Sequence, residues 1–266
     1  MDKKERIDKI EQQSITLRKF HNFVKLKLYQ KYAKNSNILL DIGTGRGGDM
    51  IKWHKNNIQQ VIALDINNVY ISEAISRYNY NLQLKRRDYN FYYCNPKSIF
   101  INFLNSKELT KSFDSISCMF ALHYFFDNIN NIKNLLEQIS ISLKTGGYFF
   151  GTCLDGDKIH MLLGNNQKYA SNAMYIEKHY DKKEFVGNNI KFMLSGTLYF
   201  GEKMLSNEYL IFKESLIDLC DKVNLKLVEF KSFESYFNDF YLDNHGLSNE
   251  FKLSSFMNST FVFRKE

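Results

Sequence analysis

The stretch NILLDIGTGRGGD (Asn37–Asp49) decides the fold: an apolar, strand-like run ends at a cluster of glycines. A short helical stretch follows, and a second strand-like run, VIALDI (Val61–Ile66), comes after it. Gly43, Gly45 and Gly48 have the GxGxxG spacing of a nucleotide-binding turn between a strand and a helix. The pattern therefore predicts a strand–loop–helix–strand unit with a ligand at the glycines.

Outward from this unit, strand-like and helical segments alternate along the chain, which predicts right-handed crossovers and a mostly parallel, doubly wound α/β sheet. We expect residues 1–36 to form an N-terminal helical segment, with an apolar stripe between Ile15 and Tyr32. Residues 37–266 are expected to form one domain with a long insertion at about 156–210. LKLVEFKSF and STFVFRKE are expected to pair as antiparallel strands at the C-terminal edge of the sheet.

Composition excludes several classes of protein. The chain has 266 residues, of which 44% are hydrophobic and 24% charged, a globular balance. No run approaches the roughly 20 apolar residues of a membrane span, and the charged start lacks an apolar signal core. The four cysteines form no CxxC pair, so we expect free thiols and no structural zinc. A net charge of +7 permits a polyanionic partner without requiring one.

The residues around the glycines argue against a dinucleotide. Asp41 lies two residues before the first glycine, where a pyrophosphate would be repelled, and the charged Arg46 lies within the loop. S-adenosylmethionine has a cationic amino-acid end and no phosphate, so it suits this acidic approach better. Asp65, at the end of the next strand, is expected to accept hydrogen bonds from both ribose hydroxyls.

Six motifs occur in the order of one known family. They are LRKFHNFVK (Leu17–Lys25), LLDIGTGRGGDMIKW (Leu39–Trp53), DI (Asp65-Ile66), ALHYFF (Ala121–Phe126), LKTGGYFFGT (Leu143–Thr152) and FVFRK (Phe261–Lys265). Together they resemble messenger-RNA cap (guanine-N7) methyltransferases over nearly the whole chain. Within this family, the sequence is most similar to the methyltransferase domain of capping enzymes from large DNA viruses. The resemblance implies a Rossmann-like, class I S-adenosylmethionine-dependent methyltransferase.

The resemblance also implies the residues that hold the cofactor. Lys25 matches the position that contacts the methionine carboxylate, Asp65 the position that holds the ribose, and Asp88 the position that accepts from the adenine amine. The full implied set is Lys25, Asp41, Gly43, Gly45, Asp65, Asp88, Met119, through its backbone, and Tyr124.

A second implied set recognises the cap. His21 stands where the family usually has asparagine, and Asn258 stands where it usually has tyrosine. Glu208 matches the acceptor for the Watson–Crick edge of guanine. The full implied set is His21, Asn22, Arg46, Lys52, Arg77, Phe120, His123, Tyr124, Glu208 and Asn258, with Arg46, Lys52 and Arg77 facing the triphosphate.

The implied chemistry needs neither a general base nor a metal, because N7 of guanine carries a lone pair and no proton. Phe120, His123 and Tyr124 would position the reactants. The expected partners are the capped 5′ end of mRNA and other capping-enzyme domains or subunits, a triphosphatase and a guanylyltransferase, with no membrane. The expected location is the cytoplasm, in a viral factory or virion, for a viral protein, and the nucleus for a cellular one.

Two alternatives remain open from the sequence. One is methylation of another RNA position or of a small molecule. The other is a cofactor-binding platform that stimulates a partner capping subunit, which the Asn258 and Met119 departures keep open.

Overall fold

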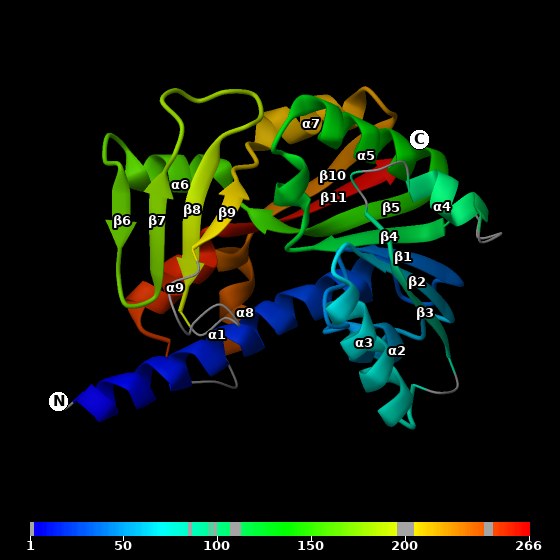
Figure 1. Cartoon of the computed structure of the whole chain (residues 1–266), viewed down its shortest axis with the longest axis horizontal. Coiled ribbons are helices and arrows are strands. Elements are labelled where there is room, and N and C mark those ends of the chain that lie inside the picture. The colour runs from blue at the N-terminus through cyan, green and yellow to red at the C-terminus, as the bar shows by residue number, and fades with distance from the viewer. Residues whose placement is uncertain are drawn as a thin grey trace.

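The computed structural model describes residues 3–84, 87–95, 97, 100–106, 113–195, 205–241 and 247–266. A seven-stranded sheet in the order β10-β11-β5-β4-β1-β2-β3 forms its centre (Figure 1). Its strands are β1 (Ile38–Ile42), β2 (Gln60–Asp65), β3 (Asp88–Tyr93), β4 (Phe113–Met119), β5 (Leu143–Leu154), β10 (Leu225–Ser232) and β11 (Asn258–Lys265). Strands β1 to β5 pair in parallel, and β11 runs antiparallel to both of its neighbours. The predicted parallel sheet with an antiparallel C-terminal edge is confirmed.

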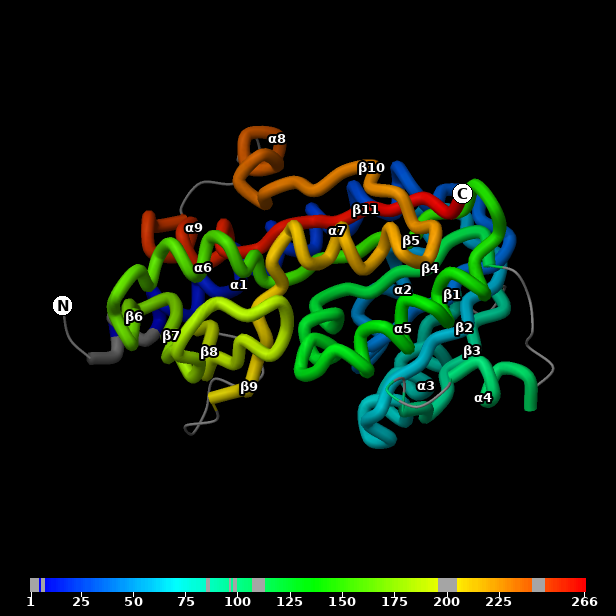
Figure 2. Tube along the Cα trace, turned by 90° about the horizontal axis from the view of Figure 1, so that it is seen from above, coloured from blue at the N-terminus to red at the C-terminus, as the bar shows by residue number. Residues whose placement is uncertain are grey.

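Helices cover both faces of this sheet (Figures 1 and 2). On one face lie α1 (Lys3–Tyr32), α2 (Met50–Lys55) and α3 (Asn68–Tyr80), and on the other lie α4 (Phe100–Ser106), α5 (Ile129–Ser142) and α7 (Lys213–Asp221). The shorter helical elements are η1 (Leu122–Phe125), η2 (Phe233–Tyr236), α8 (Phe237–Tyr241) and α9 (Asn249–Phe256).

Alternate residues of β1 explain why all of its residues except Asp41 are apolar. Leu39 packs into the core beneath α1 to α3, whereas Leu40 and Ile42 pack into the core on the other face. A strand buried on both faces reads as a nearly continuous apolar run, and in β1 only Asp41 interrupts it. Asparagine side chains cap the N-termini of two helices: Asn67 accepts from two backbone N–H groups of α3, and Asn128 does the same for α5.

Helix α1 begins at Lys3, well before the stretch Ile15–Tyr32 whose apolar stripe predicted it. The predicted stripe of Leu17, Phe20, Val24 and Leu28 is fully buried, and the helix contacts α2, α8, α9 and β5. The extra N-terminal turns lack this stripe. Ile10 nevertheless packs against a small buried cluster that contains Leu17, so tertiary contacts extend the helix.

Residues between β5 and α7 form a second, antiparallel sheet in the order β6-β7-β8-β9. The inserted elements are α6 (Gly156–Leu163), β6 (Lys168–Ala170), β7 (Met174–Lys178), β8 (Asn189–Leu194) and β9 (Ser206–Tyr209). The sequence indicated only a polar stretch before Asn189, because Met174 and Ile176 alone are buried within β7. The run KFMLSGTLYF at 191–200 is strand-like in sequence, and β8 covers its first part; residues 196–200 lie outside the described residues.

We expect Gly151→Ala to destabilise the protein strongly. A Cβ atom on Gly151, within β5, would overlap the backbone carbonyl oxygen of Cys118 in β4 and lie 2.6 Å from Cζ of Phe261 in β11. Backbone atoms of a central strand cannot move aside cheaply, so the loss of unfolding free energy should be roughly 3 kcal/mol or more. Urea denaturation measures it. Gly48→Ala is the matched control, because a Cβ there meets no atom within 4 Å; equal losses in the two variants would contradict the packing argument.

Candidate functional site

The glycine loop lies between β1 and α2 at the carboxyl ends of the parallel strands. The N–H groups of Gly43 and Thr44 both donate to the carbonyl oxygen of Leu64 in β2, at 2.9 and 3.1 Å. Gly43 has a φ of +75°, and a Cβ there would overlap Cβ of Ala121. Only glycine therefore fits at this turn, as the sequence motif required.

Asp65 closes the loop from the end of β2. One carboxylate oxygen accepts from the N–H of Gly45 at 2.7 Å, and the other accepts from the N–H of Asn67 at 2.8 Å. The side chain is buried and lies beside the loop, so Gly43, Gly45 and Asp65 come together as predicted. Each oxygen retains a further lone pair for a ligand hydroxyl.

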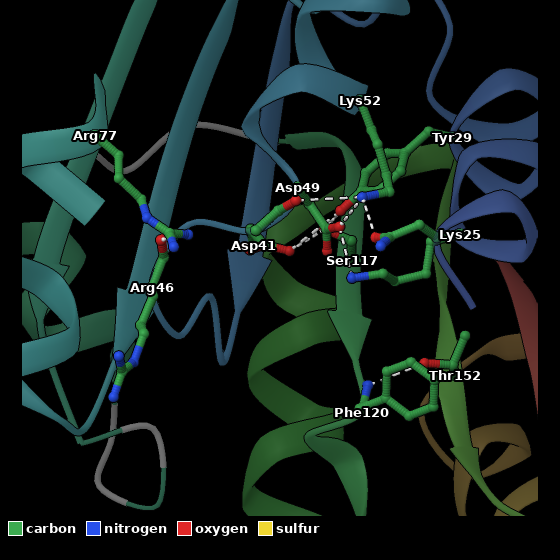
Figure 3. Close-up of polar contacts among 12 residues, drawn as sticks. Lys25, Tyr29, Asp41, Arg46, Asp49, Lys52, Arg77, Ser117, Phe120 and Thr152 are labelled. Carbon is green, nitrogen blue, oxygen red and sulfur yellow. Dashed lines mark hydrogen bonds and ion pairs between the residues drawn. The ribbon is translucent and has the colours of Figure 1, made fainter. Parts of the chain in front are cut away.

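A buried ionic cluster joins α1 to the start of α2 (Figure 3). Asp49 pairs with the ammonium groups of Lys25 and Lys52, each at 2.7 Å. Lys52 also donates to Oδ1 of Asn22 at 2.7 Å and to the carbonyl oxygen of Gly48 at 3.2 Å. Burial by itself raises the pKa of Asp49, but the two lysines outweigh it and hold that pKa below its usual value.

This cluster corrects one prediction. Lys52 was expected to face a triphosphate, yet its side chain is 10% exposed and its three donors are taken by Asp49, Asn22 and Gly48. This arrangement does not support the expected contact with a triphosphate, because the lysine neutralises a buried carboxylate instead. Asn22 is likewise engaged in this cluster.

Asp41 lies beneath the loop, in contact with β4 and α1. Its Oδ1 accepts from the hydroxyl of Ser117, and the Tyr29 hydroxyl lies 3.5 Å from the same oxygen (Figure 3). Burial, together with repulsion from Asp49, raises the pKa of Asp41 to about 7. Tyr29 and Ser117 belong to no motif, so their contacts with Asp41 could not be predicted from the sequence.

The end of β4 carries the next two predicted residues. Met119 is buried against the core on the α1 side, so its backbone alone is available to a ligand. Phe120 has a φ of +53°, a region that costs a non-glycine residue about 1–3 kcal/mol. Its N–H donates to both the carbonyl and the hydroxyl oxygen of Thr152, at 3.1 and 3.0 Å, which fixes this conformation (Figure 3).

A cavity of about 300 Å³ opens beside Phe120. Six predicted residues line it: His21, Phe120, His123, Tyr124, Glu208 and Asn258. Its remaining lining comes mainly from β8, with Phe192, Met193 and Leu194. The inserted sheet therefore supplies one wall, including its only predicted site residue, Glu208.

Glu208 is the charged group of this cavity. One carboxylate oxygen is in contact with Nε2 of His123. The Tyr124 hydroxyl donates to the other oxygen at 3.4 Å. Burial would raise the pKa of Glu208, but His123 and the neighbouring hydroxyl groups hold it below its usual value. An ionised acceptor thus faces an aromatic cavity.

His21 and Asn258 form the opposite wall. The His21 ring stacks on Phe120, with centroids 5.3 Å apart and planes 25° apart. Its Nε2 lies 2.8 Å from the hydroxyl of Ser255, whose carbonyl accepts from the Asn258 amide at 2.9 Å. Burial, reinforced by Lys25, lowers the pKa of His21 to about 3, so the ring is neutral at pH 7.

Arg46 and Arg77 lie together on the other side of the loop from Lys25 and Phe120 (Figure 3). Arg77 donates to the carbonyl oxygen of Arg46 at 3.0 Å. The Arg46 guanidinium pairs with Glu73 at 3.0 Å and lies 4.7 Å from the ring centre of Tyr70. Both arginines therefore remain at the surface near the loop.

Asp88 is the one predicted cofactor residue that the structure places elsewhere. The register pairs Asp88 with Gln60, at the start of β2, and pairs Asp65 with Tyr93, at the end of β3. Five residues of strand separate the two carboxylates, roughly 16 Å. The prediction for Asp88 is therefore wrong. The polar residue that follows β3 at the correct edge is Asn95, which a correct strand boundary would have identified.

Among the residues that the structure describes, no group of three or more His, Cys, Asp or Glu side chains is arranged to hold a metal ion. In the same part of the chain, no helix combines the length and the apolar character that crossing a membrane requires.

Comparison with known proteins gives a consistent result. The profile of the mRNA (guanine-N(7))-methyltransferase domain matches residues 2–259. The mRNA cap guanine-N(7) methyltransferase of Eremothecium gossypii is 31% identical over 237 residues, which cover 84% of this chain and 54% of that protein. A probable mRNA-capping enzyme of Acanthamoeba polyphaga mimivirus is 28% identical over 262 residues, covering 84% of this chain and 22% of that protein.

The chain thus spans about half the length of the fungal relative and less of the viral one. Fungal, plant and viral relatives match at similar identity, so the closer likeness to viral enzymes stays a prediction.

Solved structures show the same fold. An S-adenosylmethionine-dependent methyltransferase from Clostridium acetobutylicum superposes with a TM-score of 0.58 at 16% identity, over 93% of this chain and 91% of that one. One from Mesorhizobium loti gives 0.56 at 14% identity, over 92% and 98%. The predicted class I methyltransferase fold is confirmed.

We expect Asp41→Asn to stabilise the ligand-free protein increasingly as the pH rises. The Asp41 pKa is about 7 in the folded protein and near 3.8 when exposed, so folding becomes less favourable as the pH rises between these values. The stability gap between variant and wild type should widen by about 2–3 kcal/mol from pH 5 to pH 8. Urea denaturation at both pH values measures it.

Asp114→Asn is the matched control, because backbone N–H groups and Lys144 outweigh partial burial and keep the pKa of Asp114 below its usual value. Its gap should not widen over this range. An unchanged gap for Asp41→Asn would refute the raised pKa.

Proposed function

Since the chain belongs to the mRNA (guanine-N(7))-methyltransferase domain family, as its motifs predicted, we propose that it transfers a methyl group from S-adenosylmethionine to N7 of the cap guanine in GpppN-mRNA. The observation that carries this proposal is the cavity in which ionised Glu208 faces the aromatic rings of Phe120, Tyr124 and His21. This cavity adjoins the end of β4, next to the glycine loop.

The residues around the loop fit S-adenosylmethionine. Gly43 leaves no room for a side chain, and Asp65 offers a carboxylate for the ribose hydroxyls. Lys25 and Asp49 provide one charge of each sign, which matches the carboxylate and the ammonium of a methionine end. Asn95, rather than Asp88, is assigned to the adenine side. Bound S-adenosylmethionine supplies an electrophilic methyl group on a sulfonium.

The cavity fits a guanine that becomes positively charged. The Glu208 carboxylate can accept from the N–H groups of the Watson–Crick edge, and it favours positive charge developing on the base. Aromatic faces contribute about 0.5–2 kcal/mol each toward a cation. Because His21 is neutral, it adds no opposing charge. Positioning alone, without a general base, is worth up to roughly 7–11 kcal/mol.

Arg46 and Arg77 are assigned to the triphosphate. Their guanidinium groups can bind phosphate oxygens in pairs, and Arg46 would exchange its surface ion pair with Glu73, worth about 1 kcal/mol at most, for a phosphate. Lys52 is left out of this role because it is committed to Asp49.

The same proposal covers the partners of the protein and its cellular location. The substrate is the capped 5′ end of mRNA, made by a triphosphatase and a guanylyltransferase that reside in other domains or subunits. No metal takes part in the step. The protein would act in the nucleus of a cell, or in the cytoplasm or virion of a virus.

A methyl-transfer assay tests the reaction with labelled S-adenosylmethionine and three RNAs: GpppA-capped, already N7-methylated, and uncapped. We expect label on the first RNA alone, and its loss in Asp65→Ala, with at least a tenfold weaker cofactor affinity by calorimetry. Label on the premethylated RNA would move the target to a ribose or an internal base. Cofactor binding without any transfer would favour a platform that stimulates a partner.

We expect Glu208→Gln to lower kcat/KM for GpppA-RNA about 100-fold, because the neutral amide loses the charge that favours the cationic base, worth about 3 kcal/mol. Steady-state kinetics measure it, and the Kd for S-adenosylmethionine should stay unchanged. Glu177→Gln, in β7 of the same sheet, is the control and should behave as wild type. Equal effects of the two substitutions would remove Glu208 from the site.

A further inference from the structure

A second, larger depression lies on the outer side of the glycine loop. It encloses about 770 Å³ between α2, the C-terminal half of α3 and the turn that follows α3. Gly47 and Gly48 form its inner end, Arg77 and Tyr80 come from α3, and Leu82 comes from the turn. We call it the α2–α3 groove. Nothing in the reaction proposed above uses Tyr80 or the turn.

The groove is continuous with the positions assigned to the triphosphate. Gly47 and Gly48 follow Arg46 directly in the chain, and Arg77, which lines the groove, donates to the Arg46 carbonyl at 3.0 Å. A strand that leaves the two arginines on this side therefore enters the groove. Phe120, beside the guanine cavity, lies on the other side of the loop from the two arginines (Figure 3), and the inserted strand β8 lines that cavity.

The groove has the type of surface that binds single-stranded nucleic acid. Tyr80 is 87% exposed and Leu82 is 76% exposed, although both are large and apolar. The lining also contains the hydroxyl group of Ser76 and the amide groups of Asn81 and Gln83. An aromatic platform beside a guanidinium binds any base by stacking and the adjoining phosphate by charge.

We propose that the α2–α3 groove holds the RNA nucleotides that follow the first transcribed one, with a base stacked on Tyr80. This proposal rests on the cap-methylation function proposed above. The groove binds without regard to base identity, since every base presents an aromatic face and Arg77 reads only phosphate. The cap therefore provides the recognition, and the groove provides additional affinity that grows with RNA length.

The test compares a capped probe that reaches the groove with one that does not. The long probe is a GpppA-capped RNA of ten nucleotides with a 3′ fluorophore, and the short probe is the GpppA dinucleotide. Fluorescence anisotropy gives the Kd of the long probe directly and that of the short one by competition, so binding is measured even if no methyl group is transferred. KM for both probes is measured in parallel.

The variants are Tyr80→Ala and Leu82→Ser, with Phe185→Ala as a control in an exposed aromatic outside the groove. We expect wild type to bind the capped RNA more tightly than the dinucleotide. Tyr80→Ala should weaken capped-RNA binding roughly five- to twentyfold and leave the dinucleotide unchanged, because one stacked base is lost. Leu82→Ser should act in the same direction, and Phe185→Ala should change neither probe.

Two results would overturn the proposal that the groove binds RNA. One is a Tyr80→Ala variant, folded by circular dichroism, that retains the full gain in affinity with RNA length. The other is an equal loss for both probes, which would mean that Tyr80 acts through the cap site. A purified protein that binds capped RNA through Tyr80 but methylates neither probe would instead refute the proposed reaction and leave the groove supported.

Discussion

The buried contact of Asp49 with Lys25 and Lys52 is the interaction on which the site depends. It ties α1, which carries His21 and Asn22, to the helix that begins at the glycine loop. Removing either lysine would leave a buried charge poorly compensated, a change that typically costs about 3–5 kcal/mol. The cluster therefore sets the position of α1, and through His21 it also sets one wall of the cavity.

Two ligand environments of different character meet at the end of β4. On the loop side lie charged and polar groups of both signs, which fit the oppositely charged groups of the proposed cofactor. On the cavity side, one ionised carboxylate lies among aromatic rings, and the neighbouring histidine of α1 stays neutral. Phe120 separates the two, and its left-handed backbone aims the ring into the cavity while the chain turns toward η1. The strained backbone at this residue is consistent with a function that requires the Phe120 ring in this position.

Features set by a short stretch of chain were predictable from the sequence. The glycine loop and Asp65 follow from one turn and one strand end, and the apolar stripe of α1 follows from helical spacing. Asp88 was misplaced because a strand start and a strand end look alike without the register. Lys52 was assigned to the triphosphate by the resemblance, and the sequence carries no local signal of its buried cluster, because its acceptor Asn22 lies thirty residues away. Strands β6 and β7 were missed because they are too short, at three and five residues, to show a clear alternation.

The cavity joins residues that are distant along the chain: His21 contacts Ser255, 234 positions later, and Tyr124 contacts Glu208 across 84. During synthesis, the ribosome releases α1 long before α9 and β11 exist to cover it. Closing loops of this length is slow compared with forming the β1–β2 unit, so the cofactor half can assemble early and the cavity last. Until then, Phe20 and its apolar neighbours on α1 have no permanent cover, and the nascent chain is exposed to aggregation at that helix.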